Sequence, residues 1–149
     1  MIRIYLDACC LNRPFDDQTQ TRMRLEAEAV LIILTQCETG TWEWIGSEAL
    51  DWEIKQTPDP ERRRRVQSLV SHAHHSVPIG TSEVERAGEL EAWGIAAFDA
   101  LHLACAESGG ADVLLTTDDK LLRRSAARAA ELYVGVANPL AWLREVSET

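Results

Sequence analysis

The sequence lacks an excess of basic residues, a long apolar run and a signal-peptide core. Its 24 acidic residues outnumber the 15 basic ones, giving a net charge of −9. That balance argues against a broad basic face for binding nucleic acid. No run of about 18 uncharged apolar residues is present, so no membrane-spanning helix is expected. The apolar stretch at the amino terminus is short and is interrupted by Asp7, which predicts a cytoplasmic protein with no membrane partner.

Paired-cysteine spacing is also missing. None of the four cysteines belongs to a C-x-x-C motif, and two of them are adjacent: Cys9, Cys10, Cys37 and Cys105. We interpret them as buried, reduced thiols that pack like small hydrophobic residues. A zinc site or a catalytic thiol is the minor alternative.

The composition is that of one ordinary globular domain. Hydrophobic residues make up 46% of the 149 residues and charged residues 26%, a balance that separates the chain from disordered sequences. No internal repeat, low-complexity tract or linker divides it. We therefore predict a single domain over residues 1–149, large enough to bury a core without disulfides.

Apolar runs and helical periodicity alternate along the chain. Strands are predicted at 2–6, 41–45, 113–115 and 132–136, with a brief one at Val77 and Ile79. A loop is predicted at 12–14, and helices at 19–37, 48–55, 61–74, 82–93, 96–107, 118–130 and 140–146. This order predicts an α/β fold whose parallel sheet is covered on both sides. In such sheets the ligand crevice lies beyond the carboxyl ends of the strands.

Two acids directly follow apolar strands. Asp7 ends the run IRIYL, and Asp118 ends VLLTTD, where Thr116 and Thr117 add hydroxyls. A carboxylate in such a position must be hydrogen-bonded, paired or metal-bound, because burying it alone is costly. For Asp118, capping of the following helix is an equally simple interpretation.

A third and a fourth acid are predicted near the same crevice. Asp99 is the only anion of the apolar segment AAFDALHLACA, where a helix start would also favour it. In SEALDWEI, three acids compete for the fourth place: Glu48, Asp51 and Glu53. Each of these three, taken alone, is as well explained as a surface acid.

Several carboxylates in one crevice would repel one another at neutral pH unless cations lay between them. Oxygen ligands select hard ions such as Mg²⁺ or Mn²⁺. Two such ions, about 3.5–4 Å apart, can promote hydrolysis of a phosphodiester. The acids therefore predict one or two bound Mg²⁺ or Mn²⁺ ions, and no nucleophile–base pair competes with them.

The sequence resembles the PIN domain family, and within it the VapC-type toxin ribonucleases of type II toxin–antitoxin systems. The resemblance covers almost the whole chain and depends on the order of five motifs: IYLDACCLNRPFDD, SEALDWEI, FDALHLACAE, ADVLLTTDDKLL and NPLAWLREV. It implies a three-layer α/β/α sandwich around a parallel sheet of four to five strands. It also implies a metal-dependent endoribonuclease, and as partners an RNA substrate and a cognate antitoxin whose basic segment docks onto an acidic chain.

The motifs assign the family's four catalytic acids to Asp7, Glu53, Asp99 and Asp118. Asp7, Asp99 and Asp118 are expected to hold the metal ions, and Glu53 to bind them directly or through water. The resemblance leaves Asp119, Glu48, Thr116 and Asn12 as possible accessory residues. The middle motif departs from the family pattern, because acids and tryptophan replace its aliphatic run.

The basic run Arg62, Arg63, Arg64 and Arg65, together with Arg13, is the candidate RNA-binding set. Solvated arginines that balance nearby acids are the alternative for the run, and a turn is the alternative for Arg13. His72, His74 and His75 are expected on one helix with their rings diverging, which disfavours a zinc site.

Five tryptophans are present: Trp42, Trp44, Trp52, Trp93 and Trp142. They indicate core packing or a dimer surface, with base stacking as the alternative, and a homodimer is expected.

Two other functions remain open. A binding module that keeps the fold but holds no metal would have no need of four matched acids. An aspartate-dependent phosphatase would use Asp7 as a nucleophile and a second aspartate two residues later, where this chain has Cys9.

Overall fold

A computed structural model of the chain describes residues 1–148 and shows a five-stranded, entirely parallel sheet with the strand order β3-β2-β1-β4-β5. Thr149, which the predicted domain includes, lies outside the described residues. The strands are β1 (Arg3–Leu6), β2 (Glu43–Ser47), β3 (His75–Val77), β4 (Val113–Leu115) and β5 (Gly135–Ala137). The α/β fold class predicted from the sequence is confirmed.

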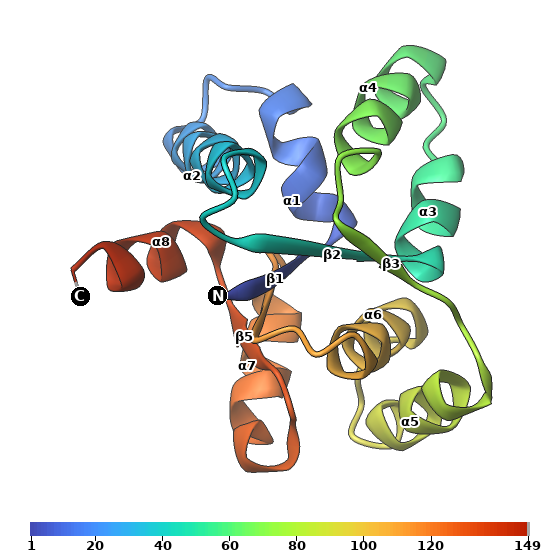
Figure 1. Cartoon of the computed structure of the whole chain (residues 1–149). Coiled ribbons are helices and arrows are strands. Elements are labelled where there is room, and N and C mark those ends of the chain that lie inside the picture. The colour runs from blue at the N-terminus through green and yellow to red at the C-terminus, as the bar shows by residue number, and fades with distance from the viewer. Residues whose placement is uncertain (149) are drawn as a thin grey trace.

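Eight α-helices cover the sheet: α1 (Ala8–Asn12), α2 (Thr21–Glu38), α3 (Glu48–Lys55), α4 (Pro60–Val70), α5 (Thr81–Glu91), α6 (Ala97–Ser108), α7 (Asp119–Ala127) and α8 (Pro139–Ser147). Two short 3₁₀ turns, η1 (Arg13–Phe15) and η2 (Ala129–Glu131), complete the described elements. Figure 1 shows α1 to α4 on one side of the sheet and α5 to α7 on the other, with α8 beside α2. The result is the expected three-layer sandwich.

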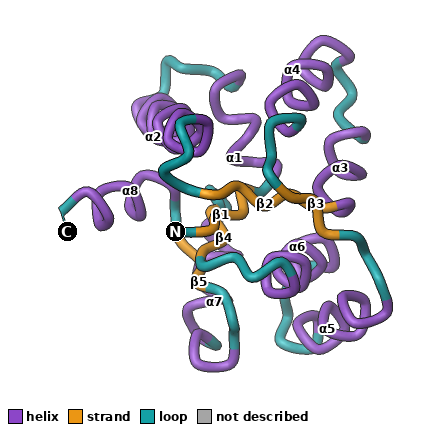
Figure 2. Tube along the Cα trace, viewed as in Figure 1, coloured by secondary structure: helices purple, strands orange, loops and turns teal. Residues whose placement is uncertain are grey.

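The alternation of side chains along β1 explains the three layers. Ile4 and Leu6 lie in the core beneath α1 to α4, whereas Tyr5 points into the core shared with α5 and α6. All three side chains are fully buried, because a central parallel strand has helices on both faces. In Figure 2 the strands form the central layer between the two groups of helices.

Several local predictions were wrong. The strand expected at 132–136 begins only at Gly135, and the one expected to include Ile79 ends at Val77. The segment expected to form a loop at 12–14 belongs to α1 and η1, because Asp7 caps a helix too short to show periodicity. The second strand runs from Glu43 rather than Thr41. The arginine-rich helix α4 ends at Val70, so the three histidines after it do not share a helix, and His75 begins β3.

Close packing against the sheet constrains the turn after α6. A Cβ atom added at Gly109 would lie 2.7 Å from Cγ2 of Val77 and 2.9 Å from Cγ2 of Ile45, whereas one added at Gly88 in α5 would have no atom within 4 Å. Within residues 1–148, no helix combines the length and the apolar character needed to cross a bilayer.

We expect Gly109→Ala to lower the free energy of unfolding by about 1–3 kcal/mol, because the added methyl group overpacks the junction with the sheet. Gly88→Ala is the matched control and should raise it by about 0.5–1 kcal/mol through helix propensity. Urea denaturation of both variants measures this difference. Equal stability of the two variants would contradict the packing described here.

Candidate metal centre

Asp7 lies at the carboxyl end of β1 and begins α1. Its Oδ1 accepts hydrogen bonds from the backbone N–H of Cys10 at 3.1 Å and from the thiol of Cys9 at 2.7 Å. The side chain is only 5% exposed. Burial, followed by the charge of Cys9, holds the pKa of Asp7 well above its ordinary value. An additional positive charge would therefore be bound favourably here.

Cys9 shares the environment of Asp7. Hydrogen bonding with Cys10, and then with Asp7, Thr116 and Thr117, lowers the pKa of the Cys9 thiol to about 5. The Sγ atom accepts from the backbone N–H of Thr117 at 3.3 Å and lies 3.4 Å from Oγ1 of Thr116. Cys9 and Asp7 therefore compete for protons at the end of the sheet.

Asp99, in the first turn of α6, interacts electrostatically with the other acids. Its pKa is raised to about 6, first by burial and then by the negative charges of Asp118, Asp7 and Glu53. These carboxylates come from segments far apart in the sequence, and the fold brings each of them close enough to Asp99 to repel its charge.

Asp118 follows β4 and is exposed. Its Oδ1 caps α7 by accepting from the backbone N–H groups of Lys120 at 2.9 Å and Leu121 at 3.3 Å. The capping interpretation therefore holds for that oxygen, while Oδ2 takes no part in the cap. The buried hydroxyl of Thr116 accepts from the backbone N–H of Asp118 at 3.1 Å, which fixes the turn that presents this aspartate.

Glu53 is joined to a chain of buried polar groups. Its Oε2 lies 2.8 Å from Nε2 of His102, and Nδ1 of that ring lies 2.6 Å from the hydroxyl of Tyr5. The same hydroxyl is 2.6 Å from Oγ of Ser47, which accepts from the backbone N–H of Leu50 at 3.1 Å. His102, Tyr5 and Ser47 are almost completely buried.

With a neutral His102, each of these four side chains can donate or accept the hydrogen bonds that its neighbours require, and all the donors point toward Glu53. The carboxylate of Glu53 only accepts, so the Nε2–H of His102 donates to it. Nδ1 then accepts from the Tyr5 hydroxyl, which in turn accepts from the hydroxyl of Ser47. The carboxylate of Glu53 is thus held by groups from β1, β2 and α6.

Glu48 and Asp51 occupy different positions from Glu53. Glu48 is exposed in the first turn of α3, and Asp51 lies in the same turn. Of the three acids, only Glu53 is tied to the buried polar chain, and its charge contributes to the raised pKa of Asp99.

Asp119 is already paired. Arg22 contacts both of its carboxylate oxygens, at 2.9 and 2.8 Å, and also binds Oε2 of Glu26 at 3.2 Å. The almost completely buried Glu26 additionally accepts from Arg13 at 2.8 Å and from the amide of Asn138 at 2.6 Å. This network connects the segments that follow β1, β4 and β5, and it leaves Asp119 with its charge neutralised.

The amide of the remaining accessory candidate, Asn12, donates to the carbonyl of Ala8 at 2.8 Å, one turn earlier in α1.

The basic candidates are largely engaged within the chain. Arg13 binds Asp16 as well as Glu26, and Arg62 binds Asp16 and the carbonyl of Phe15. Arg63 donates to the carbonyl of Thr57, and Arg65 pairs with Glu61. Arg64 is exposed.

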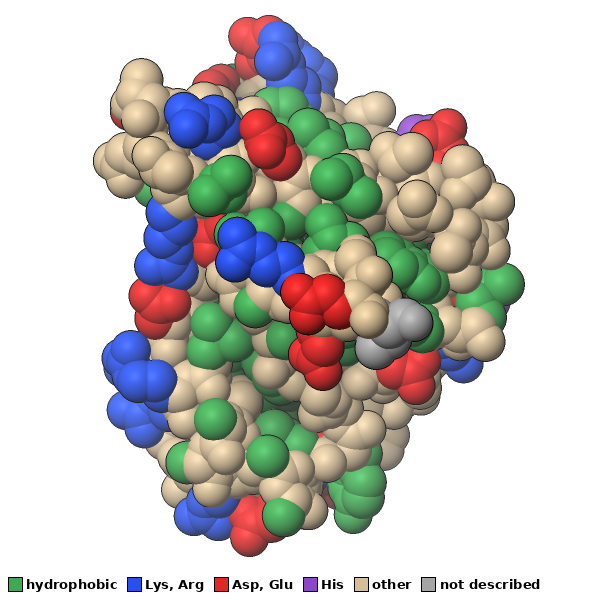
Figure 3. All heavy atoms as spheres, turned by 90° about the vertical axis from the view of Figure 1, so that its left-hand side faces the viewer, with side chains coloured by type: hydrophobic (Ala, Val, Ile, Leu, Met, Phe, Trp, Pro, Cys, Tyr) green, Lys and Arg blue, Asp and Glu red, His purple; other side chains and the backbone are tan. Residues whose placement is uncertain are grey.

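On the face shown in Figure 3, basic and acidic side chains are interspersed, with no large patch of one sign.

A small group of potential ligand atoms lies at the sheet edge. Within residues 1–148, the one group of three potential ligand atoms that all lie within 4.8 Å of one another comes from Asp7, Cys9 and Cys10. Asp99 interacts electrostatically with both Asp7 and Asp118, but these three acids do not form such a group. A cation between these carboxylates would relieve the repulsion that raises the pKa of Asp99.

The PIN domain family model matches residues 4–127, which is most of the chain. The chain belongs to the PIN domain family.

Two solved structures have a fold similar to that of this PIN domain. The crystal structure of VapBC2 from Rickettsia felis, bound to a DNA fragment from their promoter, is 15% identical with a TM-score of 0.59, and the match covers 93% of this chain and 98% of that one. The structure of PAE2754 from Pyrobaculum aerophilum is 16% identical with a TM-score of 0.54, covering 99% and 91% respectively. At this identity they support the fold alone. No curated protein sequence matches the chain.

Sequence reasoning missed two residues of this PIN domain site. Cys9 was grouped with the buried thiols, an expectation that holds for Cys10, Cys37 and Cys105 but not for the half-buried Cys9. His102 was passed over in an apolar helix, although its position three residues after Asp99 places both on one helix face. That spacing was the available signal.

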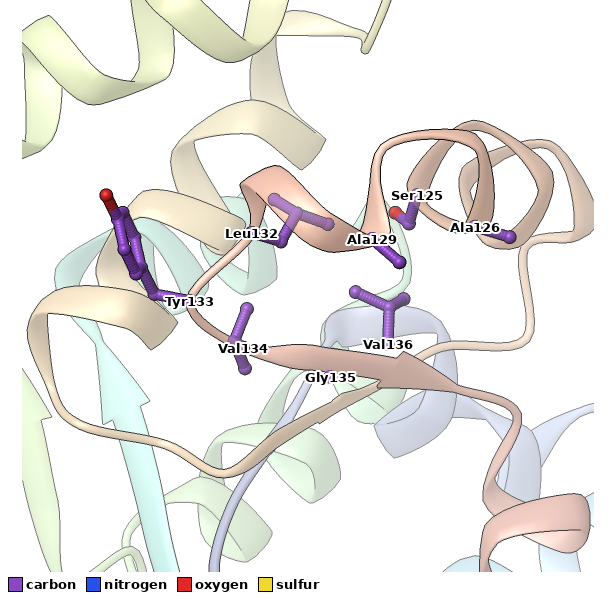
Figure 4. Close-up of a pocket in the computed structure, with 8 residues that line it drawn as sticks. All are labelled: Ser125, Ala126, Ala129, Leu132, Tyr133, Val134, Gly135 and Val136. Atoms are coloured by element: carbon purple, nitrogen blue, oxygen red, sulfur yellow. The ribbon is translucent and has the colours of Figure 1, made fainter.

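A separate hollow lies between α7, η2 and β5 of the PIN domain (Figure 4). Its lining includes Leu132, Tyr133, Val136 and the buried Ser125, and it contains no carboxylate. It lies toward the amino end of β5, whereas the acids follow the carboxyl ends of the strands. This pocket therefore has no part in the metal centre.

The raised pKa of Asp99 predicts a pH-dependent stability in the metal-free protein. The folded state holds the proton of Asp99 more tightly than the unfolded chain, in which the pKa of this side chain is 3.8. This stabilisation is complete below about pH 4 and is lost as the pH rises through about 6. With a discount for the partly exposed side chain, the loss is about 1–2 kcal/mol.

Asp99→Asn should therefore flatten the fall in unfolding free energy between pH 4 and 7, measured by urea denaturation in the presence of EDTA. The exposed substitution Glu85→Gln should keep the wild-type slope. An unchanged slope in Asp99→Asn would show that the folded state does not raise the pKa of this carboxyl.

The buried polar chain predicts a specific cost for losing one hydroxyl. Tyr5→Phe leaves Nδ1 of His102 without its donor and the Ser47 hydroxyl without its acceptor, which should lower the unfolding free energy by about 1–3 kcal/mol. Tyr133→Phe, at a side chain that is 81% exposed, should stay within about 0.5 kcal/mol of wild type. Thermal denaturation compares the two variants. Equal melting temperatures would argue against the hydrogen bonds described for Tyr5.

Proposed function

We propose that this PIN domain is a metal-dependent endoribonuclease, the toxin of a type II toxin–antitoxin pair. The observation that carries the proposal is the PIN domain match over residues 4–127, joined to a site where burial and the charges of Asp118, Asp7 and Glu53 raise the pKa of Asp99. A buried carboxylate that neighbouring acids destabilise in this way is expected to be retained for binding cations.

In this proposal Asp7, Asp99 and Asp118 hold one or two Mg²⁺ or Mn²⁺ ions, and Glu53 binds directly or through water. When bound, the ions supply Lewis acidity for in-line hydrolysis of an RNA phosphodiester. The chain itself supplies geometry. Helix capping holds Oδ1 of Asp118, and the ring of His102 holds Oε2 of Glu53.

Thr116 is the best supported accessory residue, because its hydroxyl lies between the turn of Asp118 and the thiol of Cys9. Asp119 and Asn12 are less well supported, since Arg22 pairs with the first and Ala8 accepts from the second. Glu48 is a weaker candidate than Glu53 for the fourth acid.

The partners follow from the charge. An acidic chain of net charge −9 fits an antitoxin that docks through a basic segment, and the similar fold of VapBC2 supports this partner by analogy. RNA contact by Arg13, Arg62, Arg63 and Arg65 would require them to leave their present partners, so Arg64 is the most available of the candidate arginines. A homodimer in the cytoplasm completes the proposal.

The decisive experiment measures cleavage of unstructured RNA with Mn²⁺ or Mg²⁺. Asp7→Asn should lower kcat/KM by at least about 100-fold, since it removes a charge from the metal site, while the amide oxygen can still cap α1. Glu85→Gln, at an exposed acid of α5, should retain wild-type activity.

Full activity of Asp7→Asn would overturn the proposal. Absence of Mn²⁺ binding in calorimetry, with Asp99→Ala indistinguishable from wild type, would instead favour a binding module without metal.

A further inference from the structure

An exposed aromatic pair lies beside the acids. The rings of Trp52 in α3 and Phe98 in α6 stack with centroids 5.1 Å apart and an interplanar angle of 21°. Trp52 is 52% exposed and Phe98 is 36% exposed. Helices α3 and α6 thus share a pair of stacked aromatic rings that is partly exposed to solvent.

The pair is attached to the candidate metal centre from both sides. Trp52 immediately precedes Glu53, and Phe98 immediately precedes Asp99. The ring of Phe98 also lies 6.1 Å from that of His102, whose Nε2 binds Glu53. Contacts through His102 therefore connect the aromatic pair to the carboxylate of Glu53.

We propose that Trp52 and Phe98 form a stacking platform for one unpaired nucleobase next to the cleaved phosphodiester. This inference rests on the proposed nuclease function and assigns to its substrate one further contact, with an unpaired base. A base-paired nucleotide keeps both of its faces inside the helical stack, whereas an unpaired base can lie against an aromatic ring. Stacking tolerates any base because every base has a π-face.

The charge of the chain favours this mode of recognition. Most candidate arginines are paired within the chain, and the acids repel phosphate until cations neutralise them. A stacked base supplies affinity without positive charge. The exposed aromatic pair beside the acids would therefore supply affinity for nucleic acid that the few unpaired positive charges of this protein do not supply.

A second copy of the chain is the competing occupant of the same surface. A stable dimer buries about 800 Å² on each partner and depletes charge from the centre of the interface. On α3, Glu48 lies one turn before Trp52 and Lys55 one turn after it, so charged side chains border the pair closely. A single base fits this small surface better than a protein interface does.

The test compares cleavage of an unstructured oligoribonucleotide by Trp52→Ala, Phe98→Ala and Trp52→Phe, with Tyr133→Ala as the control for a distant exposed aromatic. The first two should raise KM by roughly tenfold with little change in kcat, as expected for the loss of one stacked base. Trp52→Phe should restore most of the affinity, and Tyr133→Ala should leave it unchanged. Wild-type KM in both alanine variants would overturn the platform.

A substrate-side change identifies the stacked base. An abasic site is placed at successive positions along the oligonucleotide, and at the position beside the cleaved bond it should weaken wild-type binding by the same factor as Trp52→Ala. It should cost nothing further in Trp52→Ala, because the two changes remove the same contact. Additive losses would overturn the proposal, as would a dimeric wild type that Trp52→Ala converts to a monomer.

Failure of the platform and failure of the nuclease function are distinguishable. Fluorescence anisotropy with the Asp7→Asn protein and Mn²⁺ measures oligonucleotide binding without cleavage. Loss of affinity on adding Trp52→Ala supports the platform even where wild type cleaves nothing. Unchanged affinity refutes the platform even where wild type cleaves RNA.

Discussion

The burial of carboxylates at the carboxyl edge of the sheet, with the repulsion that neighbouring acids add at Asp99, is the constraint on which the candidate site depends. Asp7 follows β1, Asp118 follows β4, and Asp99 lies in the first turn of α6. Each also lies at the start of a helix, where backbone N–H groups and the helix dipole partly offset a negative charge. That offset is incomplete, as the raised pKa values of Asp7 and Asp99 show. The two hydrophobic cores, one on each face of the sheet, stabilise the fold against this local cost.

Polar contacts around the acids determine which carboxylates remain available to bind a metal ion. The chain from Ser47 through Tyr5 and His102 ends on Glu53 and holds it beside the others. The network around Glu26 has the opposite consequence for Asp119, which Arg22 neutralises. Both networks join segments that follow different strands. The distinction between a site acid and a structural acid therefore lies in the partners of each carboxylate.

The acidic character of the chain changes how a nucleic acid would be recognised. Positive charge at the site would come from bound cations, and a basic partner protein would find a complementary surface. Stacking against Trp52 and Phe98 needs neither. An acidic PIN domain can in this way combine metal ions, an aromatic surface and a basic antitoxin, where a basic protein would depend on its own lysines and arginines.

The sequence by itself determined the alternation of strands and helices, and with it the parallel sheet and the positions of Asp7 and Asp118 at strand ends. These features are local, because hydrophobic periodicity and strand ends are visible within a few residues. The short helix α1 escaped detection because five residues are too few to show a period. Only the tertiary structure decided that His102 meets Glu53 across 49 residues and that Arg22 meets Asp119 across 97. Such contacts depend on how helices from different parts of the chain pack onto one sheet, and no local pattern encodes that packing.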